Sequence, residues 1–205
     1  MKALDIRVAV MLAAAWPVLA DAGQAARAAD EAGNADAQSA HREQATPIWT
    51  DHLKLAPYAS AATIKLGERV SLVIDIEPGE GMHVYAPGAE TYRVVTLSVA
   101  AQPFVRMLPM QYPPAETYVF APLNERIPVY QKPFTLRQEL VIDAQPQARA
   151  AFRGKPSLTV MGTLEYQACD DRICFNPVSV PLSWTLTLAP DAARTPSQRQ
   201  RQAPR

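Results

Sequence analysis

The chain has 205 residues, equal numbers of acidic and basic side chains and a formal net charge of zero. Proteins that bind nucleic acids leave a basic footprint in their composition, so this balance argues against such a partner. Nineteen prolines are scattered along the chain and argue against long helices, because proline breaks the helical hydrogen-bond pattern.

The first 22 residues have the pattern of a secretory signal peptide. Lys2 and Arg7 provide a positive start, residues 8–20 are apolar, and Ala20 and Ala22 frame a small-residue cleavage site. The apolar run is shorter than the roughly 20 residues that span a bilayer. We therefore expect cleavage after Ala22, no membrane insertion of the mature chain, and export to a bacterial periplasm, which is kept oxidising.

Two polar stretches flank a single predicted domain. Residues 23–46 contain no Val, Ile, Leu or aromatic residue, which predicts a disordered linker without an apolar face to bury. Residues 190–205 are rich in Arg, Gln and Pro and predict a disordered tail. The folded unit between them, residues 47–189, is large enough to be stable without disulfide bonds.

Short runs of alternating apolar and polar residues dominate this unit. The alternation predicts strands over these ranges: 69–77, 82–85, 93–99, 104–108, 134–142, 158–166 and 178–188. Leu72, Ile74 and Ile76 illustrate the pattern, because all three lie on one face of a strand. Many short strands without a 3.6-residue period predict an all-β, antiparallel β-sandwich of the immunoglobulin-like type. Pro181 lies inside the last strand and predicts an edge or a bulge there.

The stretch 109–128 interrupts this pattern. It mixes prolines with aromatic residues and does not alternate cleanly, which predicts a long loop. Loops of this length inside a compact domain are usually functional or mobile. The aromatic residues indicate that this one packs on another part of the molecule.

Cys169 and Cys174 are the only cysteines of the chain, and four residues separate them. Such a pair in an exported protein is either a structural disulfide or a redox centre that exchanges bonds with other thiols. The chain-entropy model gives a six-residue loop only about 2 kcal/mol, a small stabilisation for a domain of this size. Exchange needs one sulfur that a partner can attack and a second cysteine that can expel that partner. The spacing is compatible with both interpretations.

The residues between the cysteines carry opposing charges. Asp170 and Asp171 would raise the pKa of a neighbouring thiol, whereas Arg172 would lower it. The spacing differs from C-x-x-C, so a thioredoxin active site is not indicated.

A soft metal site is a third interpretation of the same region. Met82, His83, Cys169 and Cys174 together suit copper(I). The chain has no G-x-S-x-G elbow, phosphate-binding loop or dinucleotide fingerprint, and we expect no cofactor.

At the cysteines the sequence resembles a known family, the N-terminal periplasmic domain of the thiol:disulfide interchange protein DsbD. Residues 166–169 read YQAC and residues 174–177 read CFNP, followed by a terminal strand. Residues 81–85 (GMHVY) are similar to the family's strand beside its active site, and residues 112–130 are similar to the segment that holds its cap loop. The resemblance covers about residues 47–189.

The resemblance implies an immunoglobulin-like fold whose two cysteines cycle between dithiol and disulfide. Electrons would come from a thioredoxin-like donor or a membrane electron transporter and pass to oxidised periplasmic proteins. Cys174 would form mixed disulfides with partners and Cys169 would resolve them. His83, Tyr85 and Phe175 would flank the pair together with the charged residues 170–172. The implied cap residues are Ala115, Glu116, Thr117, Tyr118 and Phe120.

The sequence also departs from the family pattern. The best-known members have one more residue between the cysteines, and His83 stands where a tyrosine is expected. A histidine there could titrate near neutral pH and modulate exchange. No transmembrane helices or thioredoxin-like domain follow, so we expect the electron donor to be a separate protein. The leading hypothesis is a periplasmic thiol–disulfide relay, and the alternatives are a binding or structural module with a local disulfide and a copper-handling protein.

Overall fold

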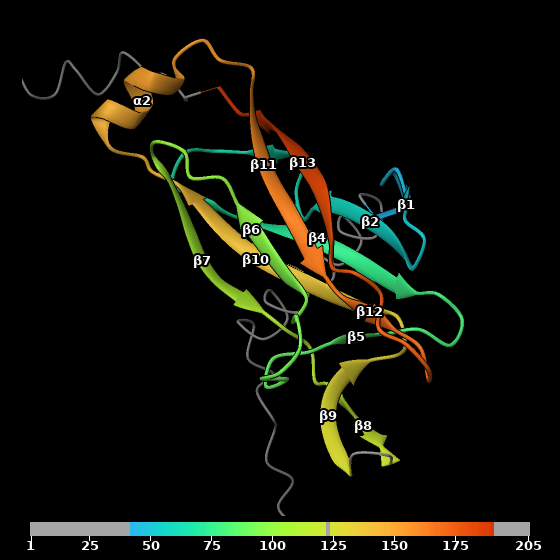
Figure 1. Ribbon diagram of the computed structural model, residues 1–205. Coiled ribbons are helices and arrows are strands. Elements are labelled where there is room, and N and C mark those ends of the chain that lie inside the picture. The colour runs from blue at the N-terminus through green and yellow to red at the C-terminus, as the bar shows by residue number, and fades with distance from the viewer. Residues whose placement is uncertain (1–41, 122–123, 191–205) are drawn as a thin grey trace, which may run out of the picture. The chain divides into compact units, whose positions relative to one another are not determined.

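The computed structural model describes residues 42–121 and 124–190 (Figure 1). The predicted signal peptide, residues 23–41 of the predicted linker and residues 191–205 of the predicted tail lie outside the described residues. The strands are β1 (Ile48–Trp49), β2 (Leu53–Ala59), β3 (Thr63–Ile64), β4 (Arg69–Pro78), β5 (His83–Tyr85), β6 (Thr96–Val99), β7 (Val105–Gln111), β8 (Glu116–Phe120), β9 (Glu125–Tyr130), β10 (Phe134–Ile142), β11 (Ser157–Tyr166), β12 (Ala168–Cys169) and β13 (Val178–Leu188). A short helix, α2 (Pro146–Phe152), precedes β11.

Two sheets face each other and enclose the main core. One has the strand order β1-β2-β4-β10-β7 and the other β3-β13-β11-β6, and the neighbouring strands are antiparallel except for β3 and β13. Buried side chains from both sheets form a single apolar cluster. Its fully buried members include Leu55, Leu72, Ile74, Leu136, Leu140, Leu164 and Leu186. The predicted all-β, immunoglobulin-like sandwich is confirmed.

Alternation explains how these strands form and which way they face. Every second residue of β13 from Val180 to Leu188 is buried, and its intervening residues are exposed. Leu72, Ile74 and Ile76 of β4 are all buried, as predicted, and Val73 between them is buried as well. A period of two places one set of side chains between the sheets and the other set on the outside.

Pro181 occupies a position where β13 has a strand on one side only. It lies opposite Thr163 of β11, whereas β3 pairs with β13 only at Thr187 and Leu188. Proline lacks an N–H donor and is tolerated where no ladder bond is needed. The predicted edge position is therefore confirmed for this part of the strand.

The stretch 109–128 is not the long loop that we predicted. β7 continues to Gln111, and β8 and β9 form an antiparallel hairpin in which Tyr118 lies opposite Ile127. Prolines separate these strands into pieces of five to seven residues, too short for the alternation to be recognised. We call residues 116–130 the cap hairpin. It projects from the end of the sandwich that lies opposite α2 (Figure 1).

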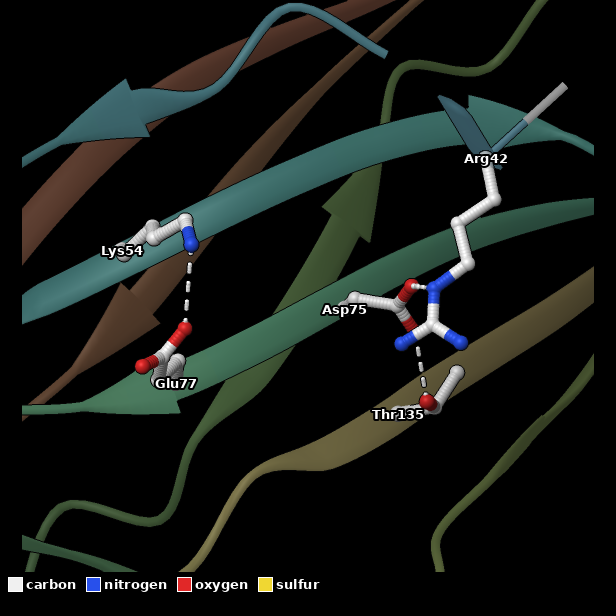
Figure 2. Close-up of polar contacts among 5 residues, drawn as sticks. All are labelled: Arg42, Lys54, Asp75, Glu77 and Thr135. Atoms are coloured by element: carbon white, nitrogen blue, oxygen red, sulfur yellow. Dashed lines mark hydrogen bonds and ion pairs between the residues drawn. The ribbon is translucent and has the colours of Figure 1, made fainter. Parts of the chain in front are cut away.

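The predicted linker has an ordered end on the outer face of the first sheet (Figure 2). Arg42 Nε lies 2.6 Å from the Oδ2 atom of Asp75, and the Thr135 hydroxyl donates a 2.6 Å hydrogen bond to Oδ1 of the same carboxylate. Lys54 pairs with Glu77 at 3.1 Å on the same face. Lys54 and Glu77 are both exposed, so their pair contributes little to stability, about 0–1 kcal/mol, whereas in the other pair the Asp75 side chain is mostly buried. The contact with Asp75 places residue 42 beside β4, within a stretch that composition alone assigns to the linker.

Candidate functional site

A small third sheet brings together three segments that are far apart in the sequence. Its strand order is β12-β5-β9-β8. Cys169 of β12 lies opposite His83 of β5, and Tyr85 of β5 lies opposite Val129 of β9. β12 follows β11 after a single residue, so the long strand of the sandwich delivers the first cysteine directly to this sheet.

The cysteines close a tight turn. Cys169 and Cys174 are joined by a disulfide, and their backbones form an antiparallel bridge. The Oδ1 atom of Asp170 accepts 2.7 Å hydrogen bonds from the backbone N–H groups of Arg172 and Ile173. These bonds lower the pKa of the Asp170 carboxyl. From the sequence we expected Asp170 to act as a charge near the thiols. In the structure its side chain also stabilises the turn through these two hydrogen bonds.

The two sulfur-bearing residues differ sharply in exposure. Cys169 is 1% exposed, whereas Cys174 is exposed at the surface of the turn. A thiolate from another protein can therefore approach Cys174 but not Cys169. The arrangement suits exchange in which the outer cysteine is attacked and the inner one leaves.

Tyr85 is the tyrosine beside the disulfide. Its hydroxyl lies 3.0 Å from Cys169 Sγ and 3.3 Å from Cys174 Sγ, and the side chain is buried. Burial, with smaller contributions from Tyr92, Tyr118 and Glu125, raises the pKa of Tyr85 to about 12. The hydroxyl therefore keeps its proton and can donate a hydrogen bond to a sulfur anion.

We expect Tyr85 to ionise later than an ordinary tyrosine when the folded protein is titrated with alkali. Its pKa is 10.0 in the unfolded reference and about 12 in the fold, so the native state holds this proton more tightly. The contribution of Tyr85 to the free energy of unfolding is complete below the first value and is lost as the pH rises toward the second. Ultraviolet absorbance of tyrosinate in the wild type and in Tyr85→Phe checks this. If Tyr85→Phe lost an absorbance transition near pH 10 and kept the one at higher pH, the raised pKa would not belong to Tyr85.

His83 is buried between two aromatic rings. It stacks on Tyr118 with ring centroids 4.6 Å apart and meets the edge of Tyr85 at 5.6 Å. Burial lowers the pKa of His83, and the opposing charges of Asp170 and Asp171 do not cancel this effect. His83 is therefore a neutral packing residue around neutral pH and titrates at a lower pH than the sequence suggested.

The cap hairpin covers one side of the disulfide with some of the predicted cap residues. Tyr118 and Phe120 line a cavity of about 70 Å³ beside the sulfurs. Ala115 and Thr117 are exposed, and Glu116 forms an ion pair with Lys132 instead. The side chains that line the cavity are His83, Tyr85, Tyr92, Tyr118, Phe120, Ile127 and residues 169–174. A cavity of this size has room for a few water molecules but is too small for a peptide segment of a partner.

Phe175 lies on the other side of the turn and does not line this cavity. Its ring centroid is 4.4 Å from that of His52. The backbone on both sides of the ring is fixed, because the Phe175 N–H donates to Ala168 and its carbonyl accepts from Gln167 Nε2. Phe175 therefore anchors the turn to the sandwich beside Cys174.

Sequence reasoning missed some residues that line or support the cavity, namely Tyr92, Glu125, Ile127 and Ile173. Ile173 is 55% exposed within the turn, which is unusual for a large apolar side chain and offers a contact to a partner. Tyr92 stacks on Tyr85 with ring centroids 4.1 Å apart. Tyr92 lies in the irregular segment 86–95, just before the predicted strand 93–99, which begins only at Thr96 in the structure. Only its aromatic character, in a segment otherwise rich in small residues, could have drawn attention to it.

The described part of the chain has no preformed metal site that would support the copper hypothesis. Nowhere in residues 42–121 and 124–190 do three or more His, Cys, Asp or Glu side chains gather as a metal-binding group. Cys169 and Cys174 are bonded to each other, and Met82 does not line the cavity.

Helices in the described part of the chain fall short of the length and apolarity needed to cross a membrane.

Comparison with known families decides the relationship. The family described as "Thiol:disulfide interchange protein DsbD, N-terminal" matches residues 53–181, more than half of the chain. The chain belongs to the DsbD N-terminal domain family. Its cysteine pair, at the strand end described above, is the disulfide-forming pair of a thiol–disulfide exchange domain.

Two solved structures have a chain path similar to part of this one. The N-terminal periplasmic domain of ScsB from Proteus mirabilis is 15% identical, with a TM-score of 0.48, and the match covers 76% of this chain and 55% of that one. The Neisseria meningitidis DsbD N-terminal domain in the reduced form is 12% identical, with a TM-score of 0.39, and the match covers 62% and 82%. The chain thus spans about half the length of the ScsB chain. Among curated proteins, none has a matching sequence.

Proposed function

We propose that this protein is a periplasmic thiol–disulfide relay that takes electrons from a thioredoxin-like donor or a membrane electron transporter and reduces disulfides of other periplasmic proteins. The observation that carries the proposal is the asymmetry of the pair, with Cys174 exposed and Cys169 buried beside the Tyr85 hydroxyl. A purely structural bridge has no need of this arrangement. Family membership supports the same chemistry.

The first half of the cycle loads electrons onto the pair. A donor thiolate attacks Cys174 Sγ, the Cys169–Cys174 bond breaks, and Cys169 leaves as a thiolate next to the Tyr85 hydroxyl. Tyr85 donates a hydrogen bond to this anion and keeps its own proton, because its pKa is about 12. The second donor thiol then attacks the donor sulfur of the mixed disulfide, which frees Cys174. Two electrons and two protons have moved, and the donor is left as a disulfide.

The second half passes the electrons on. The Cys174 thiolate attacks a client disulfide and forms a mixed disulfide, and one client sulfur leaves as a thiol. Cys169 then attacks Cys174, which restores the Cys169–Cys174 bond and releases the second client thiol. Cys169 needs no access to solvent for this step, which is consistent with its burial.

The cap hairpin supports a gated version of this cycle. The cavity beside the sulfurs is about 70 Å³, so a partner must either approach Cys174 from its exposed side or displace Tyr118 and Phe120. We propose that partner docking displaces the cap hairpin. The predicted signal peptide of residues 1–22 would bring the protein to the periplasm.

We also propose that residues 47–189 form the folded unit. The Arg42–Asp75 ion pair supports a start a few residues earlier, at about residue 42.

The reduction potential of the Cys169–Cys174 couple tests the proposal. We expect equilibration with thiol–disulfide buffers to give a potential above about −300 mV, within the range of exchange proteins, whereas structural bridges lie below that value. Alkylation and mass spectrometry of the equilibrated full chain measure the reduced fraction. A bridge that stays oxidised in strongly reducing dithiol buffers would identify it as structural and end the relay proposal.

A further inference from the structure

Tyr92 connects the sulfur-facing tyrosine to the far end of the cap hairpin. Its ring stacks on Tyr85 with centroids 4.1 Å apart and an interplanar angle of 14°, and its hydroxyl donates a 2.9 Å hydrogen bond to Glu125 Oε2. We propose that Tyr92 is a positioning residue that holds the Tyr85 hydroxyl at the sulfurs, and that Glu125 fixes Tyr92 in that position. The inference rests on the proposed function, because it concerns the reactivity of the same pair.

The need for positioning follows from the geometry of Tyr85. Its hydroxyl reaches two sulfurs, at 3.0 Å from Cys169 and 3.3 Å from Cys174. Hydrogen bonds weaken steeply with distance and angle, so a displacement of about 0.5 Å at the end of this long side chain is enough to degrade them. The ring needs a neighbour on its flat face as well as the edge contact from His83. Tyr92 supplies the flat contact.

The segment that carries Tyr92 turns back onto Tyr85. The Val95 N–H donates to the Tyr85 carbonyl, and the Tyr92 N–H donates to the Ala89 carbonyl at 3.3 Å. The Tyr92 ring itself is only partly buried, so packing alone does not immobilise it. The Glu125 carboxylate provides the missing constraint, and the same hydrogen bond raises the pKa of Tyr92 so that its hydroxyl remains a donor.

Glu125 belongs to the cap hairpin, which makes the constraint dependent on the cap. It is the first residue of β9 and lies opposite Phe120, a residue that lines the cavity. The Tyr92–Glu125 bond therefore joins this end of the hairpin to the ring stack on Tyr85. When a partner that reacts with Cys174 displaces the hairpin, the Tyr92–Glu125 hydrogen bond breaks and the Tyr85–Tyr92 stack is no longer held by the hairpin.

The reactivity of Cys174 in the reduced full chain tests the inference. In the reduced chain the Tyr85 hydroxyl can donate to the Cys174 thiolate while Cys169 is still protonated, because it lies within reach of both sulfurs. Tyr92→Phe, which keeps the ring and loses the bond to Glu125, should therefore shift the pH profile of Cys174 alkylation upward. We expect a shift of about half a pH unit, or about a three-fold lower rate below the midpoint. Glu125→Ala should act alike, whereas Glu125→Gln, which keeps an acceptor oxygen, should act less. Mass spectrometry after iodoacetamide treatment gives the rate at each pH.

A second background separates positioning from general loosening. Tyr85→Phe removes the hydroxyl through which Tyr92 is inferred to act, so adding Tyr92→Phe to it should produce no further shift. An equal shift in both backgrounds, or no shift in either, would overturn the inference. Tyr112→Phe is the matched control, because Tyr112 packs against the main core and does not line the cavity. Denaturation midpoints of all variants show whether a shift comes from lost stability.

The test is independent of any partner protein. Alkylation requires only the reduced sulfurs, which a strong phosphine reductant provides. If the pH profile of Cys174 alkylation does not shift but disulfide exchange with partners is normal, Tyr92 has no positioning role and the relay proposal stands. If the profile shifts as expected but no exchange with partners occurs, the positioning role stands and the relay proposal fails.

Discussion

Replacing Cys169 with serine should convert the protein into a trap for its partners. In the reduced Cys169→Ser variant, Cys174 can attack a thioredoxin-like protein whose resolving cysteine is replaced by serine and whose remaining cysteine carries a thionitrobenzoate leaving group. The attack releases thionitrobenzoate, and neither protein then has a second thiol that could break the mixed disulfide. The mixed disulfide should therefore accumulate and persist. Non-reducing electrophoresis and mass spectrometry of the adduct identify it and locate the bond at Cys174.

The reciprocal variant Cys174→Ser is the matched control. It also keeps one thiol, but Cys169 is 1% exposed and a partner disulfide cannot reach it. We expect adduct formation to be at least about 100-fold slower than in Cys169→Ser, because exchange rates depend on access to the attacking sulfur. Equal trapping by the two variants would contradict the assignment of Cys174 as the partner-facing cysteine.

The second large effect concerns stability rather than exchange. Ile74→Ala should lower the free energy of unfolding by about 2–5 kcal/mol, because the side chain is fully buried between the sheets and its truncation leaves a cavity. Replacing both cysteines with alanine should lower it by only about 2 kcal/mol or less, since the closed loop is short. Chemical denaturation of the three proteins measures both differences.

Met161→Ala calibrates this comparison. Met161 lies on β11 and is 49% exposed, so removing its side chain should change stability by less than about 0.5 kcal/mol. A loss in the double-cysteine variant as large as that of Ile74→Ala would mean that the bridge is a major structural element. The fold would then depend on the bond that the proposed cycle has to break.

These expectations share one physical basis, the separation of scaffold and site. The stability of the domain comes from the two facing sheets, whose core cluster does not include the cysteines. The disulfide belongs to a smaller cluster with Tyr85, Ala89, Ile127 and Val129. Opening the bond therefore disturbs a local group of side chains and leaves the main core unchanged.

The fold class could be read from the sequence because it depends on a local and repeated signal. β4, β10, β11 and β13 each run for at least nine residues, long enough for a period of two to be recognised. The cysteine spacing and its flanking residues were sufficient to indicate the family and the candidate site. Shorter strands such as β2 and β8 were missed, because prolines end the alternation before it becomes a pattern.

Tertiary structure alone decided which residues surround the sulfurs and how they act. Tyr85, Tyr92 and Glu125 reach the site from separate segments, and their contacts depend on how β5 pairs with β9 and β12. Exposure of Cys174 and burial of Cys169 also have no local signature, since both residues lie in one six-residue turn. Burial is set by neighbours that are distant in the chain, and so are the raised pKa of Tyr85 and the lowered pKa of His83. The sequence determined that two cysteines would meet at a strand end, and the packing around them decided which one faces a partner.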